Sequence, residues 1–405
     1  MSERKILIVT NRVPFPLKDG GNIAMTAMIE GYRRAGWKVY LLSMNTSRHY
    51  IKHEQLEKLF TNLEAFEWVD IDNELKFADI LKNYLFSKNP EHVRRFFSED
   101  FKDKLKDIIE SFKPDVVQME SVYLSTYLPV VRKYSYAVTV LRMHNVEYQI
   151  WQSLAKKHNN TFKKIYFNTL SERIRNFERR AWKEYDLLLT ITEKDMYLVK
   201  RLEDVEHVAV APYSVELDKI KVSTNENWVG YHIGAMDWMP NREGIKWFLN
   251  RAWPKIHKAA PWFEFYFAGR RMPEDFKNLN IPGVHCMDEV ADADEFISDK
   301  KILIVPIWSS GGVRVKILEA MAARKIVITT SSGVKGIEAK PDEHYLLARK
   351  PEDFARTVKW CLDNKEAAEK IADNAYNLVK NHYEYGKVIR EVIEEVEAIL
   401  SSHKR

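Results

Sequence analysis

The best candidate for chemistry in this sequence is a short segment that combines two glycines with two basic residues. Gly311 and Gly312 are followed by Arg314 and Lys316, and a helical pattern begins among them. Glycines let backbone N–H groups approach a ligand closely, and the first turn of a helix adds free N–H groups and a positive dipole end. Basic side chains at the start of a helix are unfavourable with respect to that dipole, which indicates that they serve another purpose such as ligand binding. The segment therefore predicts a binding site for a diphosphate.

Glu319 follows on the same predicted helix. A carboxylate at this place can accept two hydrogen bonds from a ribose diol, as acidic residues do in other nucleotide sites. Together with the diphosphate site, it predicts a nucleoside diphosphate as ligand. The alternative is a plain amphipathic helix, since Ile317, Leu318 and Met321 give it an apolar face.

Two further candidates follow predicted strands nearer the N-terminus. The loop after the first strand contains Gly20 and Gly21, and ligands of open α/β sheets gather beyond the carboxyl ends of the strands. The loop lacks the G-x-G-x-x-G pattern, so an ordinary turn is the alternative. His144 lies just after the strand predicted at 136–143, where an imidazole can donate to a sugar hydroxyl or to a developing charge. A loop histidine that caps backbone groups is the alternative.

These candidates require strands and helices that carry them to one edge of a sheet. Short apolar runs alternate with helical patterns, which predicts βαβ units in a doubly wound α/β sheet. The strands expected in the first half are 5–10, 38–43, 115–120, 136–143, 187–192 and 208–211. Those expected in the second half are 229–233, 263–268, 284–287, 302–306 and 326–329, with helices that start near Arg242, Asp292 and Val313.

The doubled pattern predicts two Rossmann-like domains, residues 1–212 and residues 213–385. A polar stretch at 221–227 marks their junction. Apolar residues at i, i+3, i+4 spacing predict an amphipathic helix over the last 20 residues, 386–405. The segment 51–112 is charged and aromatic, and we expect it to be a helical insertion in the first domain.

With these residues assembled, the sequence resembles the glycosyltransferases of the GT-B fold, and among them the large retaining family 4. The stretch ILEAMAARKIVITTSSGVKGIE at 317–338 is similar to the family's signature and is the most specific match. The stretches at 234–248 (GAMDWMPNREGIKWF) and 265–270 (FYFAGR) are similar to parts of its donor domain. The stretches at 141–147 (LRMHNVE) and 177–195 (FERRAWKEYDLLLTITEKD) resemble its acceptor domain, so the likeness covers nearly the whole chain.

The resemblance implies two Rossmann-like domains that face each other across a cleft. The first would bind the acceptor and the second the nucleotide-sugar donor, and the C-terminal helix would return to the first domain, with a dimer interface as the alternative for that helix. It also implies sugar transfer with retention of configuration, in which the leaving phosphate takes the acceptor proton and no metal or other cofactor is required. The protein would then contribute positioning and cationic stabilisation of the departing diphosphate.

Carried over to this sequence, the resemblance assigns roles to the candidate residues. Arg314 and Lys316 would neutralise the donor diphosphate, and Glu319 would hold the ribose. His144 would contact the donor sugar. The loop with Gly20 and Gly21 would close on the donor phosphate or on the acceptor.

The sequence departs from the family pattern at the first of its two glutamates. Counting back from Glu319, that carboxylate would fall at Gly311. A backbone amide of Gly311 or Gly312 is the expected substitute for it.

A second departure follows Gly234, which we expect to bind the donor. The family often has a basic residue immediately after this glycine, and Ala235 stands there. Arg242 or Arg270 is expected to serve instead.

Composition limits the remaining possibilities. The chain has 405 residues and a net charge of +5, which suits an anionic small ligand or a membrane surface rather than nucleic acid. Its two cysteines match no metal-ligand spacing, and no apolar stretch approaches a membrane span, so a cytoplasmic protein is expected. Basic residues cluster on one predicted helix, where they form either a solvated face or a docking surface for anionic lipid at the inner face of the membrane. They are Arg173, Arg175, Arg179 and Arg180.

Three functions are consistent with these residues. The first is a glycosyltransferase that builds a surface polysaccharide or glycolipid on a glycan or lipid-linked acceptor. The second is a nucleotide-sugar epimerase of the same fold. The third is a catalytically silent nucleotide-sugar-binding protein, which Gly311 in place of a carboxylate keeps open.

Overall fold

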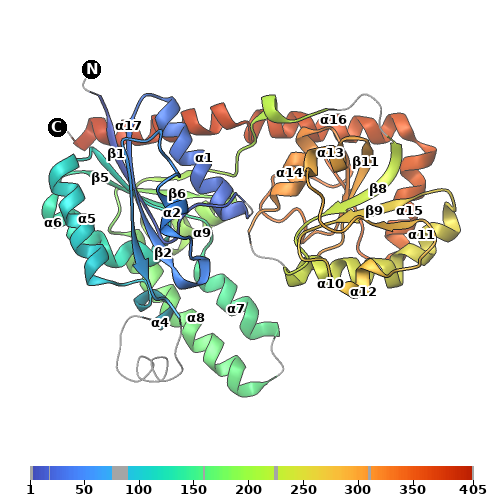
Figure 1. The fold of residues 1–405 in the computed structure, drawn as a ribbon, viewed down its shortest axis with the longest axis horizontal. Coiled ribbons are helices and arrows are strands. Elements are labelled where there is room, and N and C mark those ends of the chain that lie inside the picture. The colour runs from blue at the N-terminus through green and yellow to red at the C-terminus, as the bar shows by residue number, and fades with distance from the viewer. Residues whose placement is uncertain are drawn as a thin grey trace. The chain divides into compact units, whose positions relative to one another are not determined.

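The computed structural model describes residues 3–17, 19–74, 90–157, 160–222, 227–308 and 312–403. The chain divides into two compact units, and Figure 1 draws the elements of both. Unit 1 is formed by Met1–Pro212 and Val388–Arg405, and unit 2 by Tyr213–Lys387. Each unit is built on a parallel sheet, and this confirms the predicted α/β class with two Rossmann-like halves.

In unit 1, the described residues form a seven-stranded sheet in the order β3-β2-β1-β4-β5-β6-β7. The strands are β1 (Lys5–Thr10), β2 (Lys38–Thr46), β3 (Ala65–Ile71), β4 (Val116–Met119), β5 (Val138–Met143), β6 (Leu187–Thr190) and β7 (Val208–Val210). The chain starts at the centre, moves to one edge, and returns to build the other half. This doubly wound order brings the carboxyl ends of β1 and β4 together at the point where the direction reverses.

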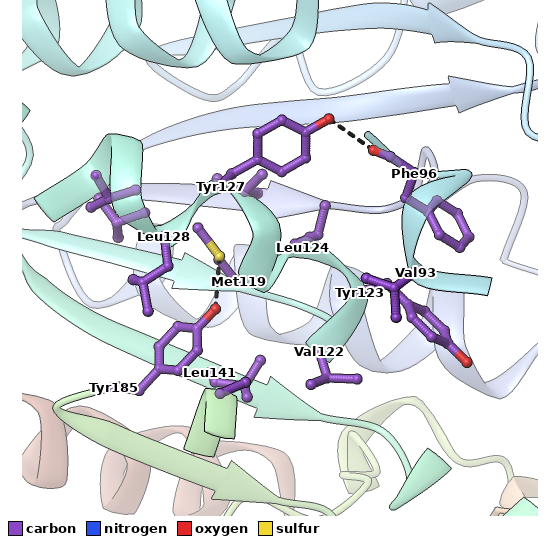
Figure 2. Packing of buried hydrophobic residues seen from close by; sticks show 14 of the residues in the cluster. Val93, Phe96, Met119, Val122, Tyr123, Leu124, Tyr127, Leu128, Leu141 and Tyr185 are labelled. Atoms are coloured by element: carbon purple, nitrogen blue, oxygen red, sulfur yellow. Dashed lines mark hydrogen bonds between the residues drawn. The ribbon is translucent and has the colours of Figure 1, made fainter. Parts of the chain in front are cut away.

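Helices connect the strands of unit 1. They are α1 (Gly20–Arg34), α2 (His53–Leu56), α4 (Glu91–Arg94), α5 (Glu99–Phe112), α6 (Leu128–Tyr134), α7 (Glu147–Lys157), α8 (Thr161–Trp182) and α9 (Glu193–Leu202), with 3-10 turns η1 (Ser47–His49) and η2 (Val122–Tyr127). The core under the sheet contains tyrosines whose hydroxyls are satisfied (Figure 2). Tyr127 donates to the Phe96 carbonyl at 2.8 Å, and Tyr185 donates to the sulfur of Met119 at 2.9 Å.

The expectation of a helical insertion at 51–112 was wrong for part of that segment. Strand β3 lies within it and pairs in parallel with β2 from Tyr40 and Ala65 onward. Acidic residues break the apolar run of β3, and an edge strand tolerates them because one side faces solvent. Glu67 is one of them, and it accepts hydrogen bonds from Tyr40 and Lys104. Residues 75–89 of the segment lie outside the described residues.

The C-terminal helix α17 (Tyr385–His403) belongs to unit 1 from Val388 onward. It packs on α1 at Gly31, where an added Cβ would lie 2.5 Å from the Cδ1 atom of Ile389. Near its end, Glu397 pairs with Arg4 at 2.9 Å, next to β1. The apolar stripe of the helix is therefore covered within unit 1.

Unit 2 has a six-stranded parallel sheet among the described residues, in the order β10-β9-β8-β11-β12-β13. Numbered within the unit, this is the 3-2-1-4-5-6 order of a Rossmann sheet. The strands are β8 (Asn227–Ile233), β9 (Phe265–Ala268), β10 (Val284–Cys286), β11 (Lys300–Val305), β12 (Ile326–Thr329) and β13 (Leu346–Leu347). The two-residue strand β13 is too short to leave a sequence pattern, and it was not predicted.

The helices of unit 2 follow the same alternation. They are α10 (Met239–Trp247), a π-helical turn η4 (Phe248–Ala252), α11 (Trp253–Ala259), α12 (Glu274–Lys277), α13 (Ala293–Ser298), α14 (Val315–Ala322), α15 (Pro351–Asp363) and α16 (Lys365–His382). Aromatic side chains fill the core between them. Phe248, for example, lies 4.7 Å from Phe265 between ring centroids.

Candidate functional site

The carboxyl edge of the unit 2 sheet holds a lysine whose three ammonium protons are all engaged. Lys316 lies in the first turn of α14, and its Nζ donates to the Ile233 carbonyl at 2.7 Å and to Oδ1 of Asn241 at 3.0 Å. It also lies 3.3 Å from Nε2 of His232. All three acceptors are neutral groups, so the positive charge is not balanced by a hydrogen-bonded carboxylate.

His232 fixes one side of this arrangement. The residue is fully buried, and its Nδ1 donates to the Ile304 carbonyl at 2.8 Å. Burial, and then the charge of Lys316, hold the pKa of His232 well below its ordinary value. The imidazole is therefore neutral, and its Nε2 lone pair is the atom that faces the ammonium group.

Two cations are crowded together at the start of α14. Burial, and then the nearby charge of Arg314, lower the pKa of Lys316 to about 7, while Glu319 opposes the shift. Burial also lowers the pKa of Arg314 to about 10. The Arg314 guanidinium donates to the Gly312 carbonyl at 2.8 Å and lies over the Trp238 ring, 4.7 Å from its centroid. The local charge favours an anionic ligand.

Glycine is required where two turns of this edge meet. An added Cβ on Gly234 would lie 2.5 Å from Nζ of Lys316, and one on Gly269 would lie 1.8 Å from the carbonyl oxygen of Gly234. The turn after β8 and the turn after β9 therefore touch through their backbones. The lysine reaches the Ile233 carbonyl only because Gly234 has no side chain.

We expect the substitution Gly269→Ala to destabilise unit 2 by about 1–3 kcal/mol, because the new methyl group overlaps backbone rather than a movable side chain. Thermal unfolding of the full chain measures this loss. Gly386→Ala is the matched control, since its Cβ would meet only the flexible carboxylate of Glu384 at 3.3 Å. Equal melting temperatures of both variants would contradict the backbone contact.

The other predicted donor residues occupy different surroundings. Arg242 extends to Asp275, 3.9 Å away, and both side chains are half exposed. Arg270 follows the Gly269 turn, and its buried Nε has no hydrogen-bond partner among the described residues. Glu319 is an exposed residue, and desolvation by the surrounding protein, followed by the charge of Asp294, raises the pKa of its carboxyl group. Of these, Arg270 is the cation best placed to accept a new anionic partner.

Of the glycine pair Gly311 and Gly312, the structure describes Gly312. Gly311 lies outside the described residues, as do Ser309 and Ser310. Gly312 has a positive φ of 72°, a conformation in which glycine is unstrained. The suggestion that backbone amides replace a missing carboxylate at this place stays a prediction.

In unit 1, His144 follows β5 and joins a buried charge network. Its Nε2 lies 2.8 Å from Glu120 Oε2, and Arg142 donates to the same oxygen at 3.2 Å. Gln118 also donates to Glu120 and accepts from the Tyr32 hydroxyl at 3.0 Å. Glu120 is 1% exposed, so its charge depends on these partners.

The pKa shifts indicate which atom of His144 carries the proton. Burial alone would raise the pKa of Glu120, but Arg142, His144 and Gln118 lower it below its ordinary value, so the carboxylate is charged. Burial lowers the pKa of His144, which makes the imidazole neutral near pH 7. Nε2–H therefore donates to Glu120, and the buried Nδ1 has no partner among the described residues. His144 thus donates to Glu120 through Nε2 and keeps a buried Nδ1, and its contact with a sugar stays a prediction.

The Gly20 loop is held by side chains that the sequence analysis did not single out. Asp19 caps α1 by accepting from the Asn22 amide at 3.1 Å, and it pairs with Arg12 at 2.6 Å. An added Cβ on Gly21 would lie 2.5 Å from Nη2 of Arg12. Gly20 itself is the first residue of α1. Gly21 therefore leaves room for a guanidinium at the carboxyl edge of the unit 1 sheet.

The arginines of α8 are largely occupied by contacts within unit 1. Arg179 donates to Glu203 and to the Leu202 carbonyl, and Arg180 donates to the Asn176 carbonyl at 3.2 Å. Arg175 lies over the Tyr148 ring, 5.7 Å from its centroid. This arrangement weakens the hypothesis that the α8 arginines form a lipid-binding face.

Sequence reasoning missed four polar residues of these two edges: Arg12, Glu120, His232 and Asn241. Three of them lie at or just beyond the carboxyl end of a strand, and that position is the signal that could have found them. Within the described parts of the chain, no cluster of three His, Cys, Asp or Glu side chains could hold a metal ion. No helix in those parts is long and apolar enough to cross a membrane.

Comparisons with known proteins agree with this architecture. A family model described as "Glycosyl transferases group 1" matches residues 229–364. An uncharacterized 44.6 kDa protein in the cps region of Klebsiella pneumoniae is 23% identical over 410 residues, which cover 96% of this chain and 99% of that protein. Among solved structures, sucrose-phosphate synthase from Thermosynechococcus elongatus has a TM-score of 0.69 at 13% identity and covers 99% of this chain and 100% of its own. Anabaena HepE in complex with UDP has a TM-score of 0.68 at 12% identity, over 97% of this chain and 100% of its own.

Proposed function

We propose that this chain, a glycosyltransferase with the GT-B fold, transfers a sugar from a nucleoside-diphosphate sugar to a glycan or lipid-linked acceptor. The observation that carries the proposal is Lys316, a partly buried cation held by three neutral acceptors at the carboxyl edge of the unit 2 sheet. A charge in that position is stabilised when an anion binds beside it. The UDP bound to HepE, which shares this fold, is an anion of the proposed class.

Three cations are available for the diphosphate in the proposed complex. A phosphate oxygen would replace the longest contact of Lys316, the one to His232 at 3.3 Å. Arg314 at the start of α14, and Arg270 with its buried Nε, would bind the remaining charge. The exposed Glu319 is the proposed partner of the ribose hydroxyls.

We propose that transfer proceeds with retention. The bond between the anomeric carbon and the diphosphate oxygen breaks while the acceptor oxygen forms its bond on the same face of the sugar. The acceptor proton passes to the leaving phosphate, so no protein base is needed. The cations stabilise the charge that develops on the diphosphate, which is where such groups lower the barrier most. We propose His144 as a contact of the donor sugar, as the family resemblance implies.

The pathway and the place of action are part of the same proposal. The relative in the cps region supports a role in polysaccharide synthesis. We further propose that the protein acts in the cytoplasm and contacts an anionic membrane peripherally, because a lipid-linked acceptor would be held there.

A donor screen by thermal unfolding tests the proposal. One of the UDP-, GDP- or ADP-sugars at about 100 times its Kd is expected to raise the Tm by roughly 5–10 °C, because selective binding stabilises the native state. CMP-sugars, which carry a single phosphate, should not raise it. Arg270→Ala should weaken this shift, whereas Arg349→Ala, a control on the same unit, should keep it. A chain that no nucleotide sugar stabilises, or that isomerises the donor sugar without an acceptor, would contradict the proposed transfer.

A further inference from the structure

Helices α7 and α8 form a hairpin whose base is firmly built into unit 1. Trp151 and Phe167 stack across it, with ring centroids 5.9 Å apart. Ser171 donates to the Tyr148 carbonyl at 2.9 Å, and both carboxyl oxygens of Glu178 accept backbone N–H groups at the start of α7. Figure 1 shows the two helices running side by side and extending beyond the sheet of their unit.

The far end of this hairpin exposes large apolar side chains. Phe162 is 84% exposed, Ile165 is 56% exposed, and Leu154 on the facing helix is 37% exposed. Phe162 and Ile165 are three residues apart on α8 and therefore share one face. We call these three residues the hairpin tip. A tip that is apolar at the end of a well-packed hairpin points to a binding surface rather than to poor packing.

The charge around the tip has one sign. Between Glu147 and Glu172 the sequence contains no acidic residue and four lysines, namely Lys156, Lys157, Lys163 and Lys164. Lys156, Lys163 and Lys164 belong to the exposed surface of the helices that carry the tip. A mixture of exposed aromatic and aliphatic residues with lysines and no carboxylates is typical of surfaces that bind anionic lipid.

We propose that the hairpin tip docks unit 1 on an anionic phospholipid membrane. Phe162, Ile165 and Leu154 enter the boundary between headgroups and acyl chains, and the lysines contact the lipid phosphates. This inference rests on the proposed function, in which a lipid-linked acceptor is modified at the membrane. It replaces the α8 arginines as the lipid-binding surface, because Arg179 and Arg180 already contact Glu203 and the backbone.

A second copy of this chain is the alternative partner for the hairpin tip, and the structure disfavours it. Three apolar side chains are far fewer than the roughly 20–30 residues per side of a stable interface. Two copies of the tip would also bring their lysines together without a carboxylate to balance them. An anionic bilayer removes both difficulties, because it is complementary in charge and needs no matching shape.

Flotation of the full chain with vesicles tests this inference. We expect binding to phosphatidylcholine vesicles that contain about one-third phosphatidylglycerol, and little binding to phosphatidylcholine alone. The double substitution Phe162→Ser with Ile165→Ser should lower the partition coefficient at least about tenfold, because two large apolar side chains no longer enter the bilayer. Lys163→Glu with Lys164→Glu should lower it by a similar factor and remove the dependence on salt. Tyr136→Ser, a change at a fully exposed aromatic elsewhere in unit 1, should leave binding unchanged.

Several results would overturn the inference. Binding that is equal with neutral and anionic vesicles, or that is unaffected by both double substitutions, would do so. So would a dimer in sedimentation experiments that the Phe162→Ser, Ile165→Ser variant abolishes while flotation stays absent. The stabilisation of each variant by the nucleotide sugar is measured in parallel. If the protein binds the nucleotide sugar but does not float with the vesicles, the membrane-docking role of the hairpin tip is refuted and the proposed function is not. If it binds no nucleotide sugar, the proposed function is refuted.

Discussion

Replacing Lys316 by alanine is expected to lower kcat/KM for sugar transfer by about 10²–10³-fold, the loss typical of removing one preorganised group that stabilises developing negative charge. Ile233 and Asn241 hold the ammonium in place, so only its longest contact, the one to His232, has to be exchanged for a diphosphate oxygen. Steady-state kinetics with the donor identified by thermal unfolding measure the effect. Lys316→Arg is not expected to restore activity, because the Gly234 turn leaves no room for the larger guanidinium.

The pH dependence gives an independent check on Lys316. Its pKa of about 7 means that the free enzyme loses the ammonium as the pH rises through 7, and kcat/KM should fall there. A bound diphosphate favours the charged form, so the corresponding fall in kcat should occur at higher pH. Because the folded pKa lies below the ordinary 10.5, the unfolded chain binds more protons between about 7 and 10.5, and the contribution of this group to stability rises with pH across that window.

The control for Lys316 is Lys340, a lysine of unit 2 whose side chain is 72% exposed. Lys340→Ala should leave both the rate and the pH profile unchanged. If Lys316→Ala retained full activity while binding the donor normally, the diphosphate would have to lie elsewhere. If it retained activity but lost the fall in kcat/KM near pH 7, the lysine would be a titrating neighbour and not a ligand of the donor.

Replacing Glu120 by alanine is expected to destabilise the protein by about 3–5 kcal/mol, because it leaves the guanidinium of Arg142 buried without its counter-charge. Arg142 is 2% exposed, and its Nη1 would keep only the Ala24 carbonyl at 2.9 Å among these partners. His144 would lose the acceptor that sets its tautomer. Urea unfolding followed by tryptophan fluorescence measures the change, with Glu206→Ala as the control, since that side chain is 87% exposed.

Acid should reduce the difference between wild type and the Glu120→Ala variant. The pKa of Glu120 lies below its ordinary 4.5 in the folded state, so the stability that it contributes is fully present above 4.5 and is lost as the pH falls through the folded value. A stability difference that persists unchanged in strong acid would mean that packing, and not charge, explains the loss. Glu120→Gln, which keeps the size of the side chain, would then be nearly as stable as the wild type.

The α/β class of both units could be predicted from the sequence because buried parallel strands produce local apolar runs. The runs around Ile6–Val9 and Ile302–Val305 are apolar on both faces, as buried strands must be. The apolar pattern of strand β3 is weaker, since Glu67 and Asp70 interrupt it, and the two residues of β13 are too few to form a pattern. Pairing with β2 and with β12 is what makes them strands, and pairing is not a local property.

By itself, the sequence determined which residue types follow each strand. It therefore determined that a glycine follows β8, at Gly234, and that two cations, Arg314 and Lys316, follow β11. Only the tertiary structure decided what those side chains contact. His232 and Asn241 surround the Lys316 ammonium, and Glu120 orients His144, because strands distant in sequence end beside one another in the folded sheet. Hydrogen bonds and pKa shifts depend on such neighbours within a few ångströms, and chain spacing does not record them.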